Sequence, residues 1–62
     1  QLIYIGDNPE KDFLAPKRMG WRTVRLKIQG QLNCHKRPLT AEAAPDYEVF
    51  SIEHLLEFLN NI

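Results

Sequence analysis

The chain has 62 residues and no net formal charge, and 44% of its residues are hydrophobic. These values describe one small globular domain and exclude a disordered segment, which carries few apolar residues and a high net charge. No apolar run reaches the roughly 20 residues of a membrane-spanning helix, and the single cysteine, Cys34, excludes an internal disulfide. We therefore expect no membrane partner. Because the chain starts at Gln1 without a signal-peptide pattern, we also expect a piece of a longer cytoplasmic protein.

The first predicted elements are a strand and a short helix. Residues 2–5 form a continuous apolar run that ends at Gly6, a pattern typical of a strand buried on both faces of a parallel sheet. A turn rich in polar residues and proline follows. A helix is then predicted over residues 13–19, with Asp12 as its N-cap and Gly20 as its C-terminal stop.

Two further strands and a second helix are predicted in the rest of the chain. The strands cover residues 23–26 and 47–50, and residues 27–45 between them are predicted to be a long loop because they lack periodicity. The last helix covers residues 52–59 and has Ser51 as its N-cap. Its apolar face is formed at i, i+3, i+4 and i+7 by Ile52, Leu55, Leu56 and Leu59.

The order of these elements predicts an α/β fold. Strands that alternate with helices pair in a parallel sheet, so we expect about three parallel strands and two helices. We treat residues 1–62 as one partial domain, because a chain this short has neither a disulfide nor a Cys/His cluster with zinc spacing to stabilise it. A sheet that lacks a neighbouring strand exposes an apolar edge, so we also expect the isolated chain to self-associate.

The turn after the first strand carries the residues most suited to chemistry. Gly6 and Asp7 stand where ligands bind in open parallel sheets, at the carboxyl end of a strand. The turn can fold Asp12 back toward Asp7, and two carboxylates at one place suit Mg²⁺. The alternative is purely structural: Asp7 stabilises the turn and Asp12 caps the helix.

The motif Gly6-Asp7-x-x-x-x-Asp12 resembles the fourth motif of the haloacid dehalogenase (HAD) superfamily. In that family a short helix, a glycine and Thr-Val follow the motif, as do Gly20 and Thr23-Val24 here. The end of the chain is similar to the family's closing strand and helix in its segments Ala44–Val49, Ser51-Ile52 and Leu55-Leu56. The resemblance covers most of the chain except residues 27–43.

The resemblance implies a fold and a function. The chain would be the C-terminal half of a Rossmann-like, HAD-like sheet, and part of a Mg²⁺-dependent phosphohydrolase that acts on a small phosphorylated metabolite. Asp7 would be a Mg²⁺ ligand, and Asp12 would bind the metal or position its ligands. Gly6 and Asn8 would lie near the phosphate, although Asn8 is equally suited to forming the turn.

The chain departs from the family pattern in its nucleophile. The family uses an Asp-x-Asp motif, and the aspartates of this chain, Asp7, Asp12 and Asp46, do not form one. We therefore expect no catalytic residue in this chain and no phosphatase activity from it alone. Cys34 and His35 lack an identifiable third partner, so we expect them to be ordinary loop residues.

The charge distribution supports an alternative from another class of protein. Residues 13–41 contain no acid and seven basic residues: Lys17, Arg18, Arg22, Arg25, Lys27, Lys36 and Arg37. The chain could be a non-catalytic binding or regulatory module that contacts an acidic partner through this segment, with Arg18, Arg22 and Arg25 as a phosphate or subunit contact. Nucleic acid is not expected, because no aromatic residues alternate with the bases. A receiver-like domain, whose acid pair also binds Mg²⁺, is a further alternative.

Overall fold

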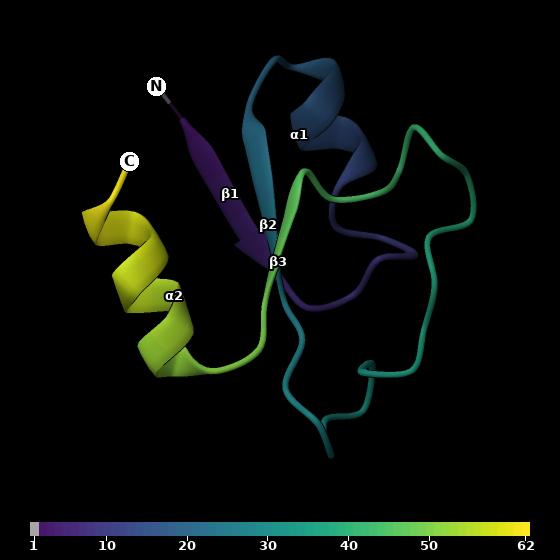
Figure 1. Cartoon of the computed structure of the whole chain (residues 1–62). Helices are drawn as coiled ribbons and strands as arrows, with labels where there is room; N and C mark the ends of the chain where they lie inside the picture. Colours follow the sequence, from purple (N-terminus) through teal and green to yellow (C-terminus); the bar gives the residue numbers. More distant parts are fainter. Residues whose placement is uncertain (1) are drawn as a thin grey trace.

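The computed structural model describes residues 2–62 and contains three strands and two helices (Figure 1). The elements are β1 (Ile3–Gly6), α1 (Leu14–Arg18), β2 (Arg22–Leu26), β3 (Tyr47–Val49) and α2 (Ile52–Asn60). The strands form one parallel sheet in the order β1-β2-β3. This is the predicted small α/β fold, and no predicted element boundary is off by more than one residue. Neither described helix combines the length and the apolar character needed to cross a membrane.

The two helices lie on opposite sides of the sheet (Figure 1). The strand register places Tyr4 of β1 and Tyr47 of β3 on opposite faces. Tyr4 packs edge-on against Phe13, next to α1, with 6.5 Å between the ring centroids. Tyr47 packs against Phe58 of α2 with 5.0 Å between the centroids. Aromatic pairs therefore fasten one helix to each face.

The middle strand, β2, is the buried one. Thr23, Val24 and Arg25 are at most 2% exposed, because β2 has a strand on either side and chain packed over both faces. β1 lies at the edge of the sheet, and Leu2 and Ile5 are 59% and 39% exposed. The prediction that the first strand is buried on both faces is wrong, because no residue of β1 is buried and Ile5 is exposed. Among residues 2–62 no strand pairs with the outer edge of β1.

Helix α1 is a little longer than one turn. Its buried contacts come from Phe13 and Pro16, which are three residues apart and so lie on one side of the helix. Gly20 ends it with a φ of +82°, as predicted for a glycine stop. The predicted N-cap is wrong, because Phe13 occupies the cap position without a side-chain hydrogen bond. The carboxylate of Asp12 instead binds backbone amides of the preceding turn.

Helix α2 has the predicted N-cap but not a fully buried face. The Ser51 hydroxyl accepts a hydrogen bond of 2.9 Å from the His54 N–H. No residue of α2 is buried, and Ile52 and Leu56 of the predicted apolar face are 49% and 57% exposed. A sheet of three strands is too narrow to cover the whole face, so the helix packs mainly over β3.

Candidate functional site

The turn after β1 is closed by one carboxylate. The Oδ2 atom of Asp12 accepts hydrogen bonds from the backbone N–H groups of Asp7 (3.1 Å) and Asn8 (2.9 Å). Asp12 thus folds back to the carboxyl end of β1, as the sequence predicted. Bonds from amides to a carboxylate are charge-assisted and stronger than neutral ones, so this contact fixes the backbone that carries the Asp7 side chain.

Gly6 allows this closure because it has no side chain. A Cβ atom at Gly6 would lie 2.7 Å from Asp12 Oδ2 and 2.9 Å from Asp12 Cβ. Real Cβ atoms essentially never approach other atoms this closely. The glycine is therefore required here by a close approach between chain segments, and not by a positive φ angle, which only Gly20 and Gly30 have.

Asn8 builds the turn from within. Its side-chain Oδ1 accepts a hydrogen bond of 3.0 Å from the Glu10 N–H, and its carbonyl accepts from the N–H groups of Lys11 and Asp12. This is the turn-forming use of asparagine, one of the two roles that the sequence left open. A role of Gly6 and Asn8 near a phosphate stays a prediction.

The turn offers an incomplete set of metal ligands. Asp7 is half-buried, and within residues 2–62 no donor hydrogen-bonds to its carboxylate, whereas one oxygen of Asp12 is occupied by two amides. In the described part of the chain no three His, Cys, Asp or Glu side chains are grouped to hold a metal ion. Mg²⁺ is commonly bound by one or two carboxylates together with water and phosphate. The residues present therefore fit part of a Mg²⁺ coordination sphere. Asp7 is the ligand whose carboxylate accepts no hydrogen bond within residues 2–62.

The residue that sequence reasoning placed most wrongly is Arg25. The sequence makes it, with Arg18 and Arg22, an alternative phosphate or subunit contact, but its side chain is 2% exposed. Its Nη2 atom donates hydrogen bonds to the carbonyls of Asn33 (3.1 Å), Cys34 (3.2 Å) and Lys36 (2.8 Å). Its Nη1 atom lies 3.5 Å from a carboxylate oxygen of Glu48 on the neighbouring strand. Arg25 therefore cannot contact a substrate phosphate or a partner subunit in this structure.

Arg25 explains how the long loop is held. Residues 27–45, predicted to be a loop, contain no strand or helix, yet Cys34 and Ala43 are buried. A segment without secondary structure must satisfy its buried carbonyls in another way, and one guanidinium satisfies three of them. The sequence alone carries no signal for this role, because it depends on the position of β2 between two strands.

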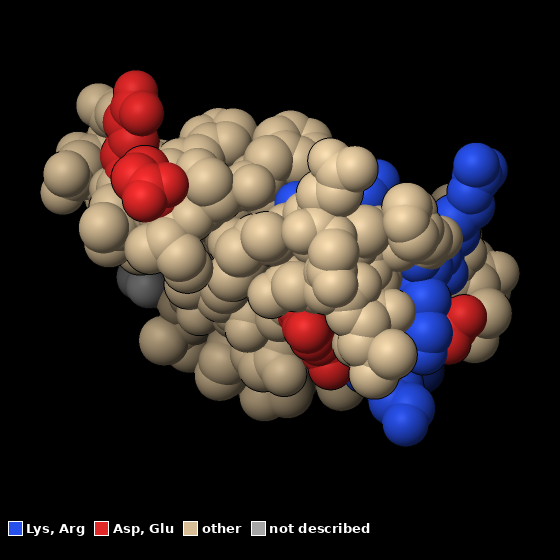
Figure 2. Space-filling view, turned by 90° about the horizontal axis from the view of Figure 1, so that it is seen from below, with Lys and Arg blue, Asp and Glu red and all other residues tan. Residues whose placement is uncertain are grey.

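Most other residues of the basic segment also have partners within the chain. Arg18 forms two hydrogen bonds with Glu42, which hold the pKa of that carboxyl below its ordinary value. Lys17 forms an ion pair with Asp46, and Lys36 forms one with Glu10. Arg22 donates a hydrogen bond to the Tyr47 hydroxyl. Most of the Lys and Arg side chains visible in Figure 2 lie toward one end of this face, and one of the acidic patches lies directly against them. Intramolecular pairing therefore engages most of the charge that an acidic partner would need.

Asp46 joins the loop to β2. Its Oδ2 atom accepts hydrogen bonds from the Thr23 N–H (2.9 Å) and hydroxyl (3.1 Å), and its N–H donates to Thr23. Partial burial raises the pKa of Asp46, but the Thr23 hydrogen bonds and the charges of Lys17 and Arg22 outweigh it. The pKa of Asp46 is therefore held below its ordinary value, and its ionised form stabilises the fold.

We expect this contact to make stability depend on pH. Because the folded-state pKa of Asp46 is lowered, its contribution is complete above about pH 5 and is lost as pH falls below about 4. The free energy of unfolding of the wild type should exceed that of Asp46→Asn at neutral pH, and the gap should shrink in acid. Urea unfolding of both proteins between pH 7 and pH 2.5 measures this, and an unchanged gap at every pH would contradict it.

Comparison of the chain with protein-family models, with curated proteins and with solved structures finds no match.

Proposed function

We propose that the chain is the C-terminal part of a HAD-like, Mg²⁺-dependent phosphohydrolase that acts on a small phosphorylated metabolite. One observation carries the proposal: Asp12 closes the turn after β1 onto Gly6 and presents Asp7 at the carboxyl end of a parallel strand. The chain would then form the C-terminal half of a Rossmann-like sheet.

The parallel sheet and the exposed edge of β1 support this placement. In open parallel sheets, ligands bind outside the carboxyl ends of the strands, and Asp7 lies there. Ile5 and Leu2 are exposed at a strand whose outer edge has no partner within residues 2–62. A further strand beside β1, from an upstream part of the protein, would cover this edge and bring a nucleophile next to Asp7.

Each residue of the turn has a distinct role in this proposal. Asp7 binds Mg²⁺ through its free carboxylate, directly or through water. Asp12 is a positioning residue, because one of its oxygens holds the Asp7 and Asn8 amides. Mg²⁺, when bound, supplies positive charge that neutralises the transferring phosphoryl group. Asp46 is engaged with Thr23, so no aspartate of this chain is left to serve as the nucleophile.

Metal binding can be tested on this chain with Mn²⁺ as a paramagnetic probe for the Mg²⁺ site. Substoichiometric Mn²⁺ should broaden the amide NMR signals of Asp7, Asn8 and Asp12 more than any others, and excess Mg²⁺ should restore them. Asp7→Asn should abolish the effect, because it removes the carboxylate that has no other partner.

The control is Glu57→Gln, which removes an exposed acid on α2 and should leave the broadening unchanged. Broadening centred on α2, or broadening of the turn that survives Asp7→Asn, would contradict the proposal.

A further inference from the structure

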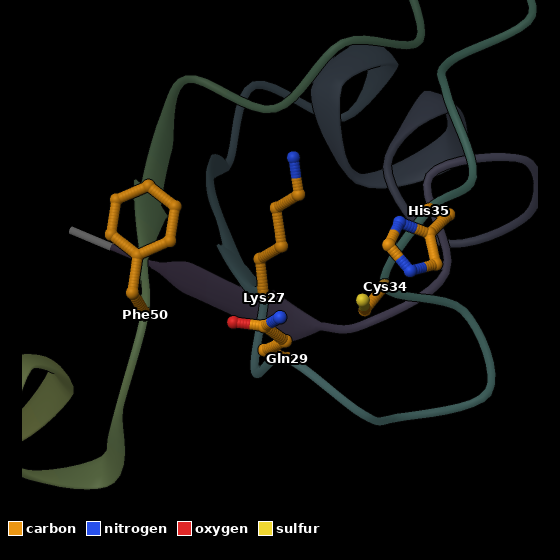
Figure 3. Close-up of a pocket in the computed structure, with 5 residues that line it drawn as sticks. All are labelled: Lys27, Gln29, Cys34, His35 and Phe50. Atoms are coloured by element: carbon orange, nitrogen blue, oxygen red, sulfur yellow. The ribbon is translucent and has the colours of Figure 1, made fainter.

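A pocket opens where β2 and β3 end. It has a volume of about 290 Å³ and is lined by Lys27, Gln29, Cys34, His35 and Phe50. Lys27 follows the end of β2 and Phe50 follows the end of β3. The pocket therefore lies at the carboxyl ends of the strands, the edge to which β1 brings Asp7. Figure 3 shows Phe50 on one side, Cys34 and His35 on the other, and Lys27 and Gln29 between them.

Hydrogen bonds hold both walls of the pocket in place. On one side, buried Arg25 binds the carbonyls of Asn33, Cys34 and Lys36, which fixes the backbone that carries His35. Cys34, on the same side as His35, is 5% exposed. The pocket is thus shaped by the folded core, as a binding site must be to avoid the entropic cost of ordering its walls.

The opposite wall is an aromatic ring with a free face. Phe50 is 56% exposed, and its ring lies 5.9 Å from the imidazole of His54, tilted by 33°. The Phe50 N–H also donates a hydrogen bond of 3.2 Å to His54 Nδ1. The Lys27 N–H donates to the Val49 carbonyl (2.8 Å) and joins the ends of β2 and β3. The Phe50 ring therefore contacts His54 and contributes an apolar surface to the lining of the pocket.

The polar groups of the pocket suit an anion. No acidic residue lines it, and Lys27 Nζ has no hydrogen-bond or ion-pair partner in the described part of the chain. Lys27, His35 and the Gln29 amide are separate donors on three side chains. Separate donors match the several oxygens of a tetrahedral phosphate, whereas a planar carboxylate is matched best by the fork of one arginine.

We infer that this pocket binds a small aromatic phosphate monoester, with its ring against Phe50 and its phosphate at Lys27 and His35. The volume is near the lower limit for small-molecule pockets, about 300 Å³, and fits a single-ring compound. The inference goes beyond the proposed function, because the pocket shares no lining residue with the turn over residues 6–12. Binding itself requires no metal, so the two claims can fail separately.

The test is titration of the 62-residue chain with phenyl phosphate in the absence of Mg²⁺, followed by amide NMR. We expect saturable shifts at residues 27–29, 34–35 and 50. Inorganic phosphate and phenol, which each carry half of the ligand, should bind at least about tenfold more weakly, because each loses one of the two contacts. Lys27→Met and Phe50→Leu should each raise the dissociation constant by about tenfold.

Lys11→Met is the matched control, because it removes a lysine that does not line this pocket. It should leave the dissociation constant unchanged. Equal weakening by Lys11→Met and Lys27→Met, or shifts centred on residues 6–12, would overturn the inference. If phenyl phosphate binds as expected while Mn²⁺ fails to broaden the turn, the pocket stands and the metal-dependent function falls.

Discussion

Replacement of Arg25 by methionine is expected to lower the free energy of unfolding by about 3–5 kcal/mol, since breaking a buried, multiply bonded charge has effects of this size. Methionine fills much of the same volume but leaves the carbonyls of Asn33, Cys34 and Lys36 without their donor. A chain of 62 residues has a total stability of only about 3–9 kcal/mol, so most of it would be lost. Urea unfolding followed by far-ultraviolet circular dichroism measures the change.

Two further variants separate the role of Arg25 from a general effect of charge. Arg18→Met removes an exposed arginine that is paired with Glu42 and should barely move the urea midpoint. Arg25→Lys keeps the charge but cannot reproduce the fork, so its stability should fall between wild type and Arg25→Met. It should also lose amide protection in residues 33–36. Equal midpoints for Arg25→Met and Arg18→Met would contradict the role of Arg25 as the anchor of the loop.

Gly6→Ala is expected to destabilise the chain by about 2–3 kcal/mol, through overpacking and the loss of charge-assisted hydrogen bonds. The new Cβ would lie 2.7 Å from Asp12 Oδ2 and 2.9 Å from Asp12 Cβ, and the second atom sits close to the backbone. The turn must therefore shift as a whole, and the amides of Asp7 and Asn8 lose their acceptor. Thermal and urea unfolding measure the stability, and the Mn²⁺ experiment measures the site.

A double-mutant cycle with Asp12→Ala assigns this effect to the contact between the two residues. If Gly6 is needed to admit the Asp12 carboxylate, Gly6→Ala should cost less in the Asp12→Ala background than in the wild type. Asp12→Asn retains an oxygen that can accept from the amides and should be milder than Asp12→Ala. A cost of Gly6→Ala that is the same in both backgrounds would show that the Asp12 carboxylate is not the reason for the glycine, because Asp12→Ala removes the carboxylate and keeps the Cβ atom.

The elements predicted correctly are those with local signals. Gly20 ends α1 through a left-handed φ, and Ser51 caps α2 through a hydrogen bond three residues along the chain. Such contacts join residues close together in the chain, so the residue types at fixed spacings in the sequence predict them. The return of Asp12 to the end of β1 is also local, over five residues, but its two possible uses have the same sequence pattern. The structure shows that Asp12 binds the amides of the preceding turn and does not cap α1.

The features that sequence reasoning missed depend on contacts between distant residues. Arg25 reaches carbonyls up to eleven residues away and Glu48 on another strand, and no periodicity records such a contact. The exposure of β1 follows from the strand order, which a run of apolar residues does not reveal. The pocket combines Cys34 and His35, expected to be ordinary loop residues, with Lys27 and Phe50 from the ends of two strands. Their proximity arises only when the loop folds over Arg25.

The proposed membership of a HAD-like phosphohydrolase is tested most directly by reading the coding sequence upstream of Gln1. The account predicts an Asp-x-Asp motif after an apolar strand, with a lysine between that motif and Gly6, because Asp7 needs a nucleophile and a second cation to act on a phosphate. An upstream sequence with neither feature would contradict the account and leave Asp7 and Asp12 as parts of a turn.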